Sequence, residues 1–476
     1  MSAQSKFTNS PFLKLLPWVI AGVLCAKYMH YDSEIWPYIL SLTLGLCACF
    51  AHGGKSILCY VSIFLLSFAL NNSKNVELPA STQTWNMIVG RKLSEGEKFN
   101  TRSASLPEGK ILIISEKNIT LAQGDQLSVR AKINKNIYPS YKNQGYSGRI
   151  FLSEDNIIVK TPSSVPSIST FFAQIQEKAL AKLSKIKLSE SNQALAEAMI
   201  LGHRLNLDKT TKEEYSLSGS YHILAVSGLH VAIIFAFVNF VLSPLVLVNS
   251  GHRAINILSI SLIWFYALLC GASASVMRAA FMFSALQLAL FSSLRIQTLN
   301  ILSASAVVTI LLDGTSIFSL SFQMSYLAVF FILTCYKPIY QRVRVRNKYL
   351  NKLIQIYIVS LLASLGVAPL LASNFGYVPV LGVIFSPLVI LSASVILWLG
   401  IIYLVLPLGG MAVGFGSVLN LVFDIQNSLI HSISSLSFSG TNITISSSTT
   451  LVIYCVLITL ALILYTKSRA ITSLNP

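Results

Sequence analysis

Residues 221–243 read YHILAVSGLHVAIIFAFVNFVLS and contain no Asp, Glu, Lys or Arg. A helix needs roughly 20 apolar residues in a row to cross the hydrocarbon core of a bilayer. The stretch therefore predicts a membrane span near 222–243. Ser227 and Gly228 interrupt the apolar run near its start, and broken helices in transporters mark substrate sites. A helix that restarts at Leu229 would direct free backbone N–H groups at the interruption.

The composition of the whole chain agrees with a membrane protein. Of its 476 residues, 54% are hydrophobic and 11% are charged, whereas a soluble domain carries about 25% charged residues. The net charge of +17 does not by itself indicate a nucleic-acid binder, because membrane proteins gather Lys and Arg in cytoplasmic loops. All seven cysteines lie in apolar segments, so we expect neither a disulfide framework nor a cysteine metal site.

Further apolar segments follow the same pattern. The first segment, at 12–29, could pass for a secretory signal peptide. It lacks a small-residue cleavage site and more spans follow at once, so we expect it to be retained as a membrane helix. The expected spans lie near 12–29, 35–51, 56–70, 222–243, 254–270, 276–292, 299–313, 317–336, 354–374, 380–407 and 449–466.

The segment 413–436 fits two interpretations, because it is apolar but holds Asp424, Gln426, Asn427 and His431. It is either a crossing that lines a wet cavity or a helix that lies flat at the interface. We favour the flat helix, which would require an extra break within 378–410, where Pro379 and Pro387 could supply it.

The distribution of cations predicts the orientation. The densest basic loop lies within 337–352, and Lys and Arg mark the cytoplasmic side. Counting crossings from a cytoplasmic N-terminus places both termini on the cytoplasmic side of a bacterial inner membrane. The polar insert at 75–160 then lies outside the cell.

Four parts follow from these patterns: an anchor with three spans at 1–74, an extracytoplasmic insert at 75–160, an amphipathic interfacial helix at 161–190, and a helical pore domain at 191–476. The insert alternates apolar and polar residues near 85–89, 110–114, 126–133 and 156–160, which predicts the strands of a small all-β domain. The fold class is thus a polytopic α-helical membrane protein with an inserted small all-β domain.

Several motifs carry a family resemblance. Residues 199–231 read MILGHRLNLDKTTKEEYSLSGSYHILAVSGLHV, 270–282 read CGASASVMRAAFM, and 320–329 read LSFQMSYLAV. In the insert, GDQLSVRAKI at 124–133 precedes PSYKNQGYSGRIFL at 139–152. In this order the segments resemble the ComEC family of competence proteins, the DNA-uptake channels of transformable bacteria. The resemblance implies that the insert is an OB-like domain.

The sequence also departs from the family pattern. His203, Gly314, Ser321 and Gly382 stand where the family tends to have an acidic residue, Pro, Gly and Asn. Many relatives also carry a metallo-β-lactamase-like domain, which needs a His-x-His-x-Asp-His cluster that the seven histidines here do not form. We therefore expect no metal site, no cofactor, no catalytic residue and no nuclease activity.

Candidate residues for a DNA path surround the interrupted helix. Arg278 lies a few residues into an expected span, where a charge costs roughly 2.5–3.5 kcal/mol, so it should face a cavity or a partner. A histidine such as His222 or His230, taken singly, is more often a packing residue than a substrate contact. Ser273 and Ser275 equally suit close helix packing. The candidates are His222, Ser227, Gly228, His230, Ser273, Ser275 and Arg278.

The insert offers a second set, in which aromatic residues lie among cations. OB folds bind single strands by stacking bases on aromatic rings in a basic groove, although a small barrel also needs aromatic residues for its core. We expect Trp85 and Phe151 to lie in the core. The candidate contacts are Tyr138, Tyr141, Tyr146, Arg130, Lys132 and Arg149.

Together these features predict a channel that passes single-stranded DNA across the cytoplasmic membrane during natural transformation. No phosphate-binding loop of the Walker type is present, so we expect a separate cytoplasmic ATP-driven motor and a separate nuclease. Membrane lipid surrounds the chain, and a homodimer is compatible with the resemblance. Two alternatives remain open: a transporter of a smaller anionic metabolite, and a scaffold of an uptake machine that conducts nothing.

Overall fold

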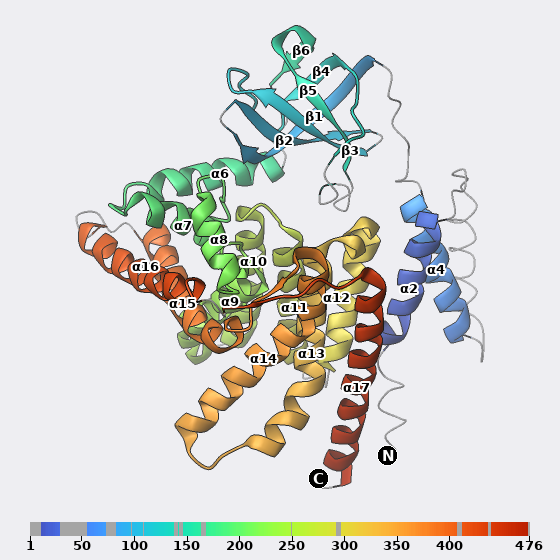
Figure 1. The fold of residues 1–476 in the computed structure, drawn as a ribbon, viewed down its shortest axis with the longest axis vertical. Coiled ribbons are helices and arrows are strands. Elements are labelled where there is room, and N and C mark those ends of the chain that lie inside the picture. Colours follow the sequence, from blue (N-terminus) through green and yellow to red (C-terminus); the bar gives the residue numbers. More distant parts are fainter. Residues whose placement is uncertain are drawn as a thin grey trace. The chain divides into compact units, whose positions relative to one another are not determined.

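The computed structural model describes residues 11–28, 55–72, 82–96, 98–107, 109–137, 141, 146–162, 168–248, 250–291, 297–406, 412–436 and 439–474. The chain divides into two compact units, which are described separately (Figure 1). One unit contains Ile175–Leu302 and Gln323–Pro476, and the other contains Pro11–Gln174 and Ser303–Phe322.

In the second of these units, α2 (Pro11–Tyr28) packs against α4 (Lys55–Asn72). The two helices approach closely at Gly22, where an added Cβ would lie 2.5 Å from the backbone oxygen of Phe64. Only glycine fits such a contact. Two of the three expected N-terminal spans therefore form helices, and the third, at 35–51, lies outside the described residues.

The same unit contains a six-stranded sheet in the order β5-β3-β2-β1-β4-β6. Its strands are β1 (Gln83–Glu95), β2 (Phe99–Leu106), β3 (Gly109–Glu116), β4 (Gln126–Ala131), β5 (Tyr146–Leu152) and β6 (Ile157–Thr161). The β3–β5 pair is parallel and the other pairs are antiparallel. A bridge between Asn134, beyond β4, and Arg149 in β5 brings the sheet back on itself. Such a partly open small barrel is the architecture of an OB fold.

The barrel has its own hydrophobic core, formed by alternate residues of its strands. Trp85 is 4% exposed, and its Nε1 donates a hydrogen bond to the backbone oxygen of Ala131 at 3.0 Å. The expected core position of Trp85 is confirmed. Phe151, also expected in the core, is 49% exposed, so that prediction was wrong. The four predicted strands correspond to β1, β3, β4 and β6, whereas β2 and β5 were not predicted.

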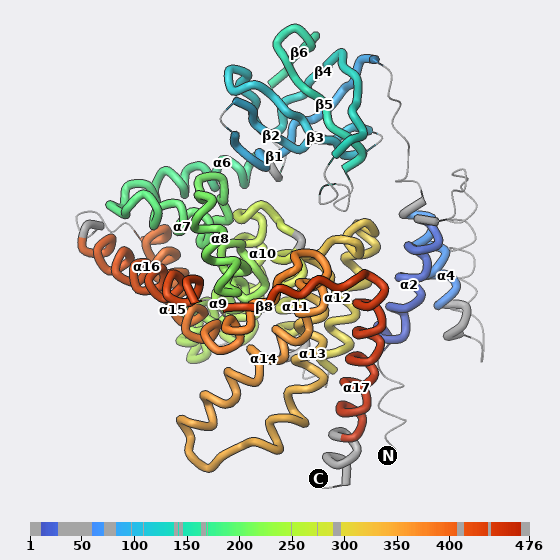
Figure 2. Tube along the Cα trace, in the orientation of Figure 1, coloured from blue at the N-terminus to red at the C-terminus, as the bar shows by residue number. Residues whose placement is uncertain are grey.

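The remaining helices and turns form the rest of the fold (Figure 2). The helices are α6 (Ile168–Leu183), α7 (Glu190–Leu201), α8 (Lys209–Leu217), α9 (Gly228–Leu242), α10 (Gly251–Leu269), α11 (Ala274–Phe291), α12 (Thr298–Leu312), α13 (Leu320–Val343), α14 (Lys348–Phe375), α15 (Gly382–Val405), α16 (Ala412–Ser434) and α17 (Ser447–Leu474). The 3₁₀ turns are η1 (Glu154–Asn156), η2 (Tyr221–Ile223), η3 (Ser243–Leu247) and η4 (Gly314–Phe318), and β7 (Tyr377–Val378) pairs with β8 (Thr441–Asn442).

Six helices in the described part of the chain are long and apolar enough to cross a membrane. They are Gly228–Leu247, Gly251–Leu269, Leu320–Val343, Lys348–Phe375, Gly382–Val405 and Ser447–Lys467. Four shorter apolar helices cover other expected spans, at Pro11–Ala26, Tyr60–Leu70, Ser275–Leu288 and Thr298–Leu312. The chain is thus a polytopic helical membrane protein with an inserted β domain.

Helix α15 runs through Pro387 without a break. A proline leaves the carbonyl four residues earlier without its helical donor, and here that carbonyl belongs to Val383. The Ser360 hydroxyl of α14 donates to it at 2.9 Å. The extra break that a flat α16 would require is therefore not found at Pro387, and α16 is not among the helices of the described segments that are long and apolar enough to cross a membrane.

The C-terminal part of α6 packs into the main helical core rather than standing apart from it. Leu183 and Ile186 are buried in one cluster with residues of α7, α15 and α16. The Lys182 Nζ donates to the backbone oxygens of Leu404 and Leu406, at 3.0 and 3.1 Å. A cation in this place stabilises the carbonyl end of α15.

Candidate functional site

Helix α9 begins at Gly228, after the turn η2 and four non-helical residues. The predicted interruption is therefore present, and the first six residues of the expected span 222–243 lie outside α9. His230 closes the first turn, because its Nδ1 lies 3.0 Å from the Ser227 Oγ and accepts a hydrogen bond from the Ser227 N–H at 3.4 Å. His230 is 1% exposed, so it stabilises the start of the helix from inside the protein.

A second helix start lies at α11. The chain enters it through Gly271 and Ala272, which both have positive φ angles, of 78° and 49°. A left-handed conformation is unfavourable for alanine, and such strain concentrates at functional sites. Ser273 follows, immediately before the first helical residue. Its Oγ is buried and has no hydrogen-bond partner among the described residues.

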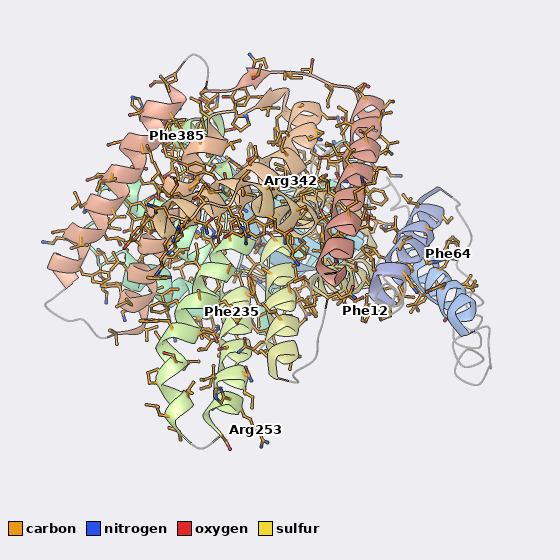
Figure 3. The ribbon with its side chains drawn as sticks, turned by 90° about the horizontal axis from the view of Figure 1, so that it is seen from below. Phe12, Phe64, Phe235, Arg253, Arg342 and Phe385 are labelled. Carbon is orange, nitrogen blue, oxygen red and sulfur yellow. The ribbon has the colours of Figure 1, made fainter. Side chains whose placement is uncertain are left out.

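The two helix starts lie at the same end of a parallel pair. Gly202, the residue after α7, would carry a Cβ 3.4 Å from a methyl group of Val226 and 3.2 Å from the backbone oxygen of Cys270. Farther along, Phe235 of α9 stacks on Phe283 of α11 with ring centroids 4.9 Å apart. Helix α10 runs back from the far end of α9 to the start of α11, and Figure 3 shows it beside α9, with Arg253 near the connecting turn.

Arg278 adds a full positive charge to the two helix starts. It is 2% exposed, and its guanidinium lies 5.3 Å from the centroid of the Tyr326 ring of α13. The next residue, Ala279, would be in ordinary contact with a Cβ on Gly228, at 3.5 Å. Each helix N-terminus carries roughly half a positive charge, so this region favours an anion such as a phosphate. We call Ser227, Gly228, His230, Ser273 and Arg278 the helix-start cluster.

Two further candidates lie at its edge. Ser275 is half-buried in the first turn of α11. His222 is exposed in η2, with its Nδ1 3.2 Å from the backbone oxygen of Gly219. His222 therefore lies outside the buried part of the cluster.

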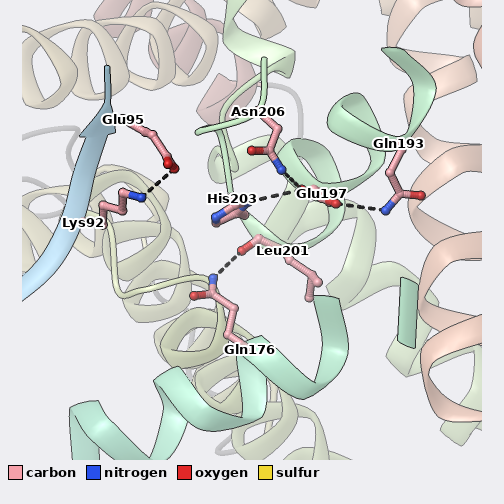
Figure 4. Close-up of polar contacts among 8 residues, drawn as sticks. All are labelled: Lys92, Glu95, Gln176, Gln193, Glu197, Leu201, His203 and Asn206. Atoms are coloured by element: carbon pink, nitrogen blue, oxygen red, sulfur yellow. Dashed lines mark hydrogen bonds and ion pairs between the residues drawn. The ribbon is translucent and has the colours of Figure 1, made fainter. Parts of the chain in front are cut away.

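A buried carboxylate, that of Glu197, is hydrogen-bonded to the loop that follows α7 (Figure 4). Glu197 of α7 accepts hydrogen bonds from Gln193 at 2.9 Å and Asn206 at 2.8 Å, and its other partner is His203 Nδ1 at 3.2 Å. Burial opposes ionisation of Glu197, but these three partners outweigh it, and the pKa of Glu197 is lowered. The contacts fix the loop that begins at Gly202, against which both helix starts lie.

We expect Glu197→Gln to destabilise the protein by about 2 kcal/mol at neutral pH, because the hydrogen bonds lose their ionised acceptor. A lowered folded-state pKa contributes stability above the ordinary value of 4.5, and this stability is lost as the pH falls through the folded-state value. Unfolding in detergent at a series of pH values measures it. The difference in the free energy of unfolding between wild type and variant should be largest at pH 7 and decrease below pH 4.5. A difference that is independent of pH would contradict the assignment.

A polar network that we had not predicted joins α16 to α7 and α8. Asn192 is 2% exposed; it donates to Asn420 and Asp424, at 3.0 and 2.8 Å, and accepts from Asn427 at 2.9 Å. The Tyr215 hydroxyl of α8 donates to Asn427 at 3.0 Å. Because α8 leads directly into η2, the network anchors the segment that precedes the helix-start cluster.

In the β domain, the candidate aromatic residues only partly converge. Tyr141 and Tyr146 meet edge to face, 5.9 Å apart, and Tyr138 lies outside the described residues. Arg130 and Lys132 are exposed. The guanidinium of Arg149 lies 5.3 Å from the centroid of the exposed Phe151 ring.

The bridge between Asn134 and Arg149 is antiparallel, so Lys132 falls level with Phe151 on the neighbouring strand. Arg149 and Phe151 form a cation–aromatic pair on the outer face of β5, and the exposed Lys132 lies on the segment that follows β4. No group of three or more His, Cys, Asp or Glu in the described segments could hold a metal ion.

Comparisons with known proteins found one family model and a curated relative that resemble this chain. The model of the Competence protein family matches residues 199–468, which include the helix-start cluster. The chain is 26% identical over 379 residues to the ComE operon protein 3 of Bacillus subtilis strain 168, a match that covers 75% of this chain and 46% of the relative. The chain thus spans about half the length of that relative. No solved structure matches. Since the family match covers more than half of the residues, the chain belongs to the Competence protein family.

Proposed function

We propose that the protein passes single-stranded DNA across the cytoplasmic membrane, with its phosphates neutralised at the helix-start cluster. The observation that carries this proposal is the buried Arg278 near the start of α11, which runs parallel to α9 with its start at the same end. A buried cation is costly in a membrane and is retained where it serves a pathway. A strand of phosphodiesters is an anion that such a region would stabilise, and the family match supports this choice of substrate.

The sidedness follows from the positive-inside rule. In our proposal the basic loop between α13 and α14 and both termini lie in the cytoplasm, and the β domain lies outside the cell. The incoming strand would meet the β domain first and the helix-start cluster second. The chain's own residues offer a path but no chemistry, so a separate motor supplies the pull and a separate nuclease removes the other strand.

The division into domains is part of the proposal. The exposed Lys178, Lys185 and Lys187 of α6 and the turn after it, together with the 54% exposed Phe171, suit a helix at the membrane surface. Such a helix would join the extracytoplasmic domain at 75–160 to the pore domain at 191–476, while 1–74 forms the anchor.

The test is DNA uptake by competent cells that carry either the wild-type chain or none. Internalised labelled DNA should be lost without the protein while surface-bound label persists. Normal internalisation without the protein would contradict the proposal. A transporter of a smaller anion should show no binding of oligonucleotides even at low salt, which separates that alternative.

Phe151→Ala should weaken binding of a single-stranded oligonucleotide to the β domain about tenfold, because one base stack contributes roughly 1–3 kcal/mol. The measurement is fluorescence anisotropy on residues 75–162, whose core lies entirely within the fragment. Phe99→Ala is the matched control, because Phe99 is 45% exposed and its cross-strand partner is the acidic Glu116. Equal losses in both variants would contradict a specific role for Phe151.

A further inference from the structure

The turn between α13 and α14 forms a dense basic surface. Residues 337–352 contain six cations and no acidic residue, and the sequence has no Asp or Glu between Asp313 and Asp424. Every residue from 341 to 350 is exposed. In Figure 1 this turn lies at the free end of the α13–α14 hairpin, and Figure 3 labels Arg342 near it.

The turn is ordered by its own polar contacts. The Asn347 side chain accepts hydrogen bonds from the N–H groups of Tyr349 and Leu350, at 3.0 and 3.1 Å, and so caps α14. Asn351 donates to the Tyr340 hydroxyl of α13 at 2.7 Å, which ties the two helices together. These hydrogen bonds therefore fix the backbone of the turn, from which the cationic side chains extend.

The cations fall into two levels along the hairpin. Lys337 and Lys352 lie next to the apolar parts of α13 and α14, at the level where lysines reach lipid headgroups. Arg342 is five residues beyond Lys337, about 7.5 Å at 1.5 Å per residue, and its Nη1 donates to the backbone oxygen of Pro338. Arg344, Arg346 and Lys348 lie at the tip, and none of the three forms an ion pair within the described part of the chain.

The composition of the tip indicates what it binds. Two arginines offer planar guanidinium groups that bind phosphate in a bidentate manner. Tyr349 is 82% exposed beside them, and an exposed aromatic ring stacks on an unpaired base. Anionic lipid would account for cations at the level of Lys337 and Lys352, but it does not call for an exposed ring and two arginines farther out.

We propose that Arg344, Arg346, Lys348 and Tyr349 form a docking surface for a single-stranded nucleic acid that leaves the membrane domain on the cytoplasmic side. This inference rests on the proposed function and adds an exit contact to it. Cations at the exit hold the emerging phosphates without base specificity. They thereby oppose backward movement of the strand.

The test uses the full chain in nanodiscs of neutral phosphatidylcholine, with a fluorescent oligothymidine as the probe and anisotropy read across a salt series. Each phosphate contact on a single strand contributes about 0.7 to the logarithmic salt slope. Arg344→Gln with Arg346→Gln should therefore reduce the slope by about 1.4 and the affinity at 0.1 M salt about 25-fold. Lys337→Gln with Lys352→Gln removes the same charge and should leave the slope unchanged.

Three results would overturn the inference: an unchanged slope in the tip variant, an equal reduction in the control variant, or loss of the difference when anionic phosphatidylserine is added. The last result would show that lipid headgroups occupy the tip. If the tip variant is unchanged while Arg278 variants still block uptake, only the docking surface is wrong. If no nanodisc binds the probe and Arg278 variants take up DNA normally, the proposed function fails as well.

Discussion

Arg278→Ala is expected to lower transformation about 100-fold. A buried cation near the start of α11 would stabilise a passing phosphate, and the cost of a charge in a membrane helix, roughly 2.5–3.5 kcal/mol, sets the scale of the loss. Each 1.36 kcal/mol changes a rate tenfold. The measurement is the count of transformants, with internalised and surface-bound label followed separately. Surface-bound label should be unchanged, because the β domain is intact.

The controls separate a role in the path from a role in folding. Arg278→Lys keeps the charge and should retain most of the activity, and Arg253→Ala removes an exposed cation near the turn before α10. The amount of each variant in the membrane is measured by immunoblot. Normal transformation by Arg278→Ala at wild-type protein levels would instead support a scaffold that conducts nothing.

The second large effect is expected at Asn192. Asn192→Leu keeps the approximate volume but removes two donors and one acceptor from a buried network. Buried polar groups left without partners cost about 1–3 kcal/mol each, so we expect a loss of about 3 kcal/mol. Unfolding of the purified protein in detergent measures it. Ser191→Ala, an exposed neighbour on α7, should have no effect.

An unchanged unfolding transition in Asn192→Leu would show that the network does not hold α16 against α7. If the free energy of unfolding decreases but transformation per folded molecule is normal, the network stabilises the fold without positioning the segment before α9. We expect both the free energy of unfolding and transformation per folded molecule to decrease, because Tyr215 links the same network to α8.

The sequence was sufficient to locate the start of α9, because the signal is local. Two small residues in an apolar run predicted the break, and the helix begins one residue before the expected Leu229. The pairing of α9 with α11 was not predictable, because it depends on the contact of Gly202 with segments near Val226 and Cys270. His230 was left open between packing and substrate contact, and its bond to Ser227 shows a capping role.

The β domain shows how short strands escape a pattern search. Strand β2 reads FNTRSASL and has few apolar residues, and β5 contains Gly148, which weakens any strand prediction. The structure explains that glycine, because a Cβ there would lie 2.4 Å from Ile133 where the barrel closes. Once β5 is known, alternation places Ile150 and Leu152 inside and Phe151 outside, so the exposed ring was in principle predictable.

The break that a flat segment at 413–436 would require is not found at Pro387, for a different reason. Pro387 is a helix-breaking signal when it is considered alone, but Ser360 of the neighbouring helix supplies the missing donor. The network around Asn192 was also beyond reach, since its partners are separated by more than 200 residues. Local propensity cannot reveal bonds that form only when distant helices pack.

The central claim is that a strand of DNA passes the helix-start cluster. The most direct measurement places a photoreactive amino acid at position 273, irradiates cells during uptake, and scores attachment of labelled DNA to the protein. The account predicts attachment at Ser273 and none at Leu391, an exposed apolar residue of α15. Absence of attachment at position 273 in cells that internalise DNA normally, or equal attachment at both positions, would contradict it.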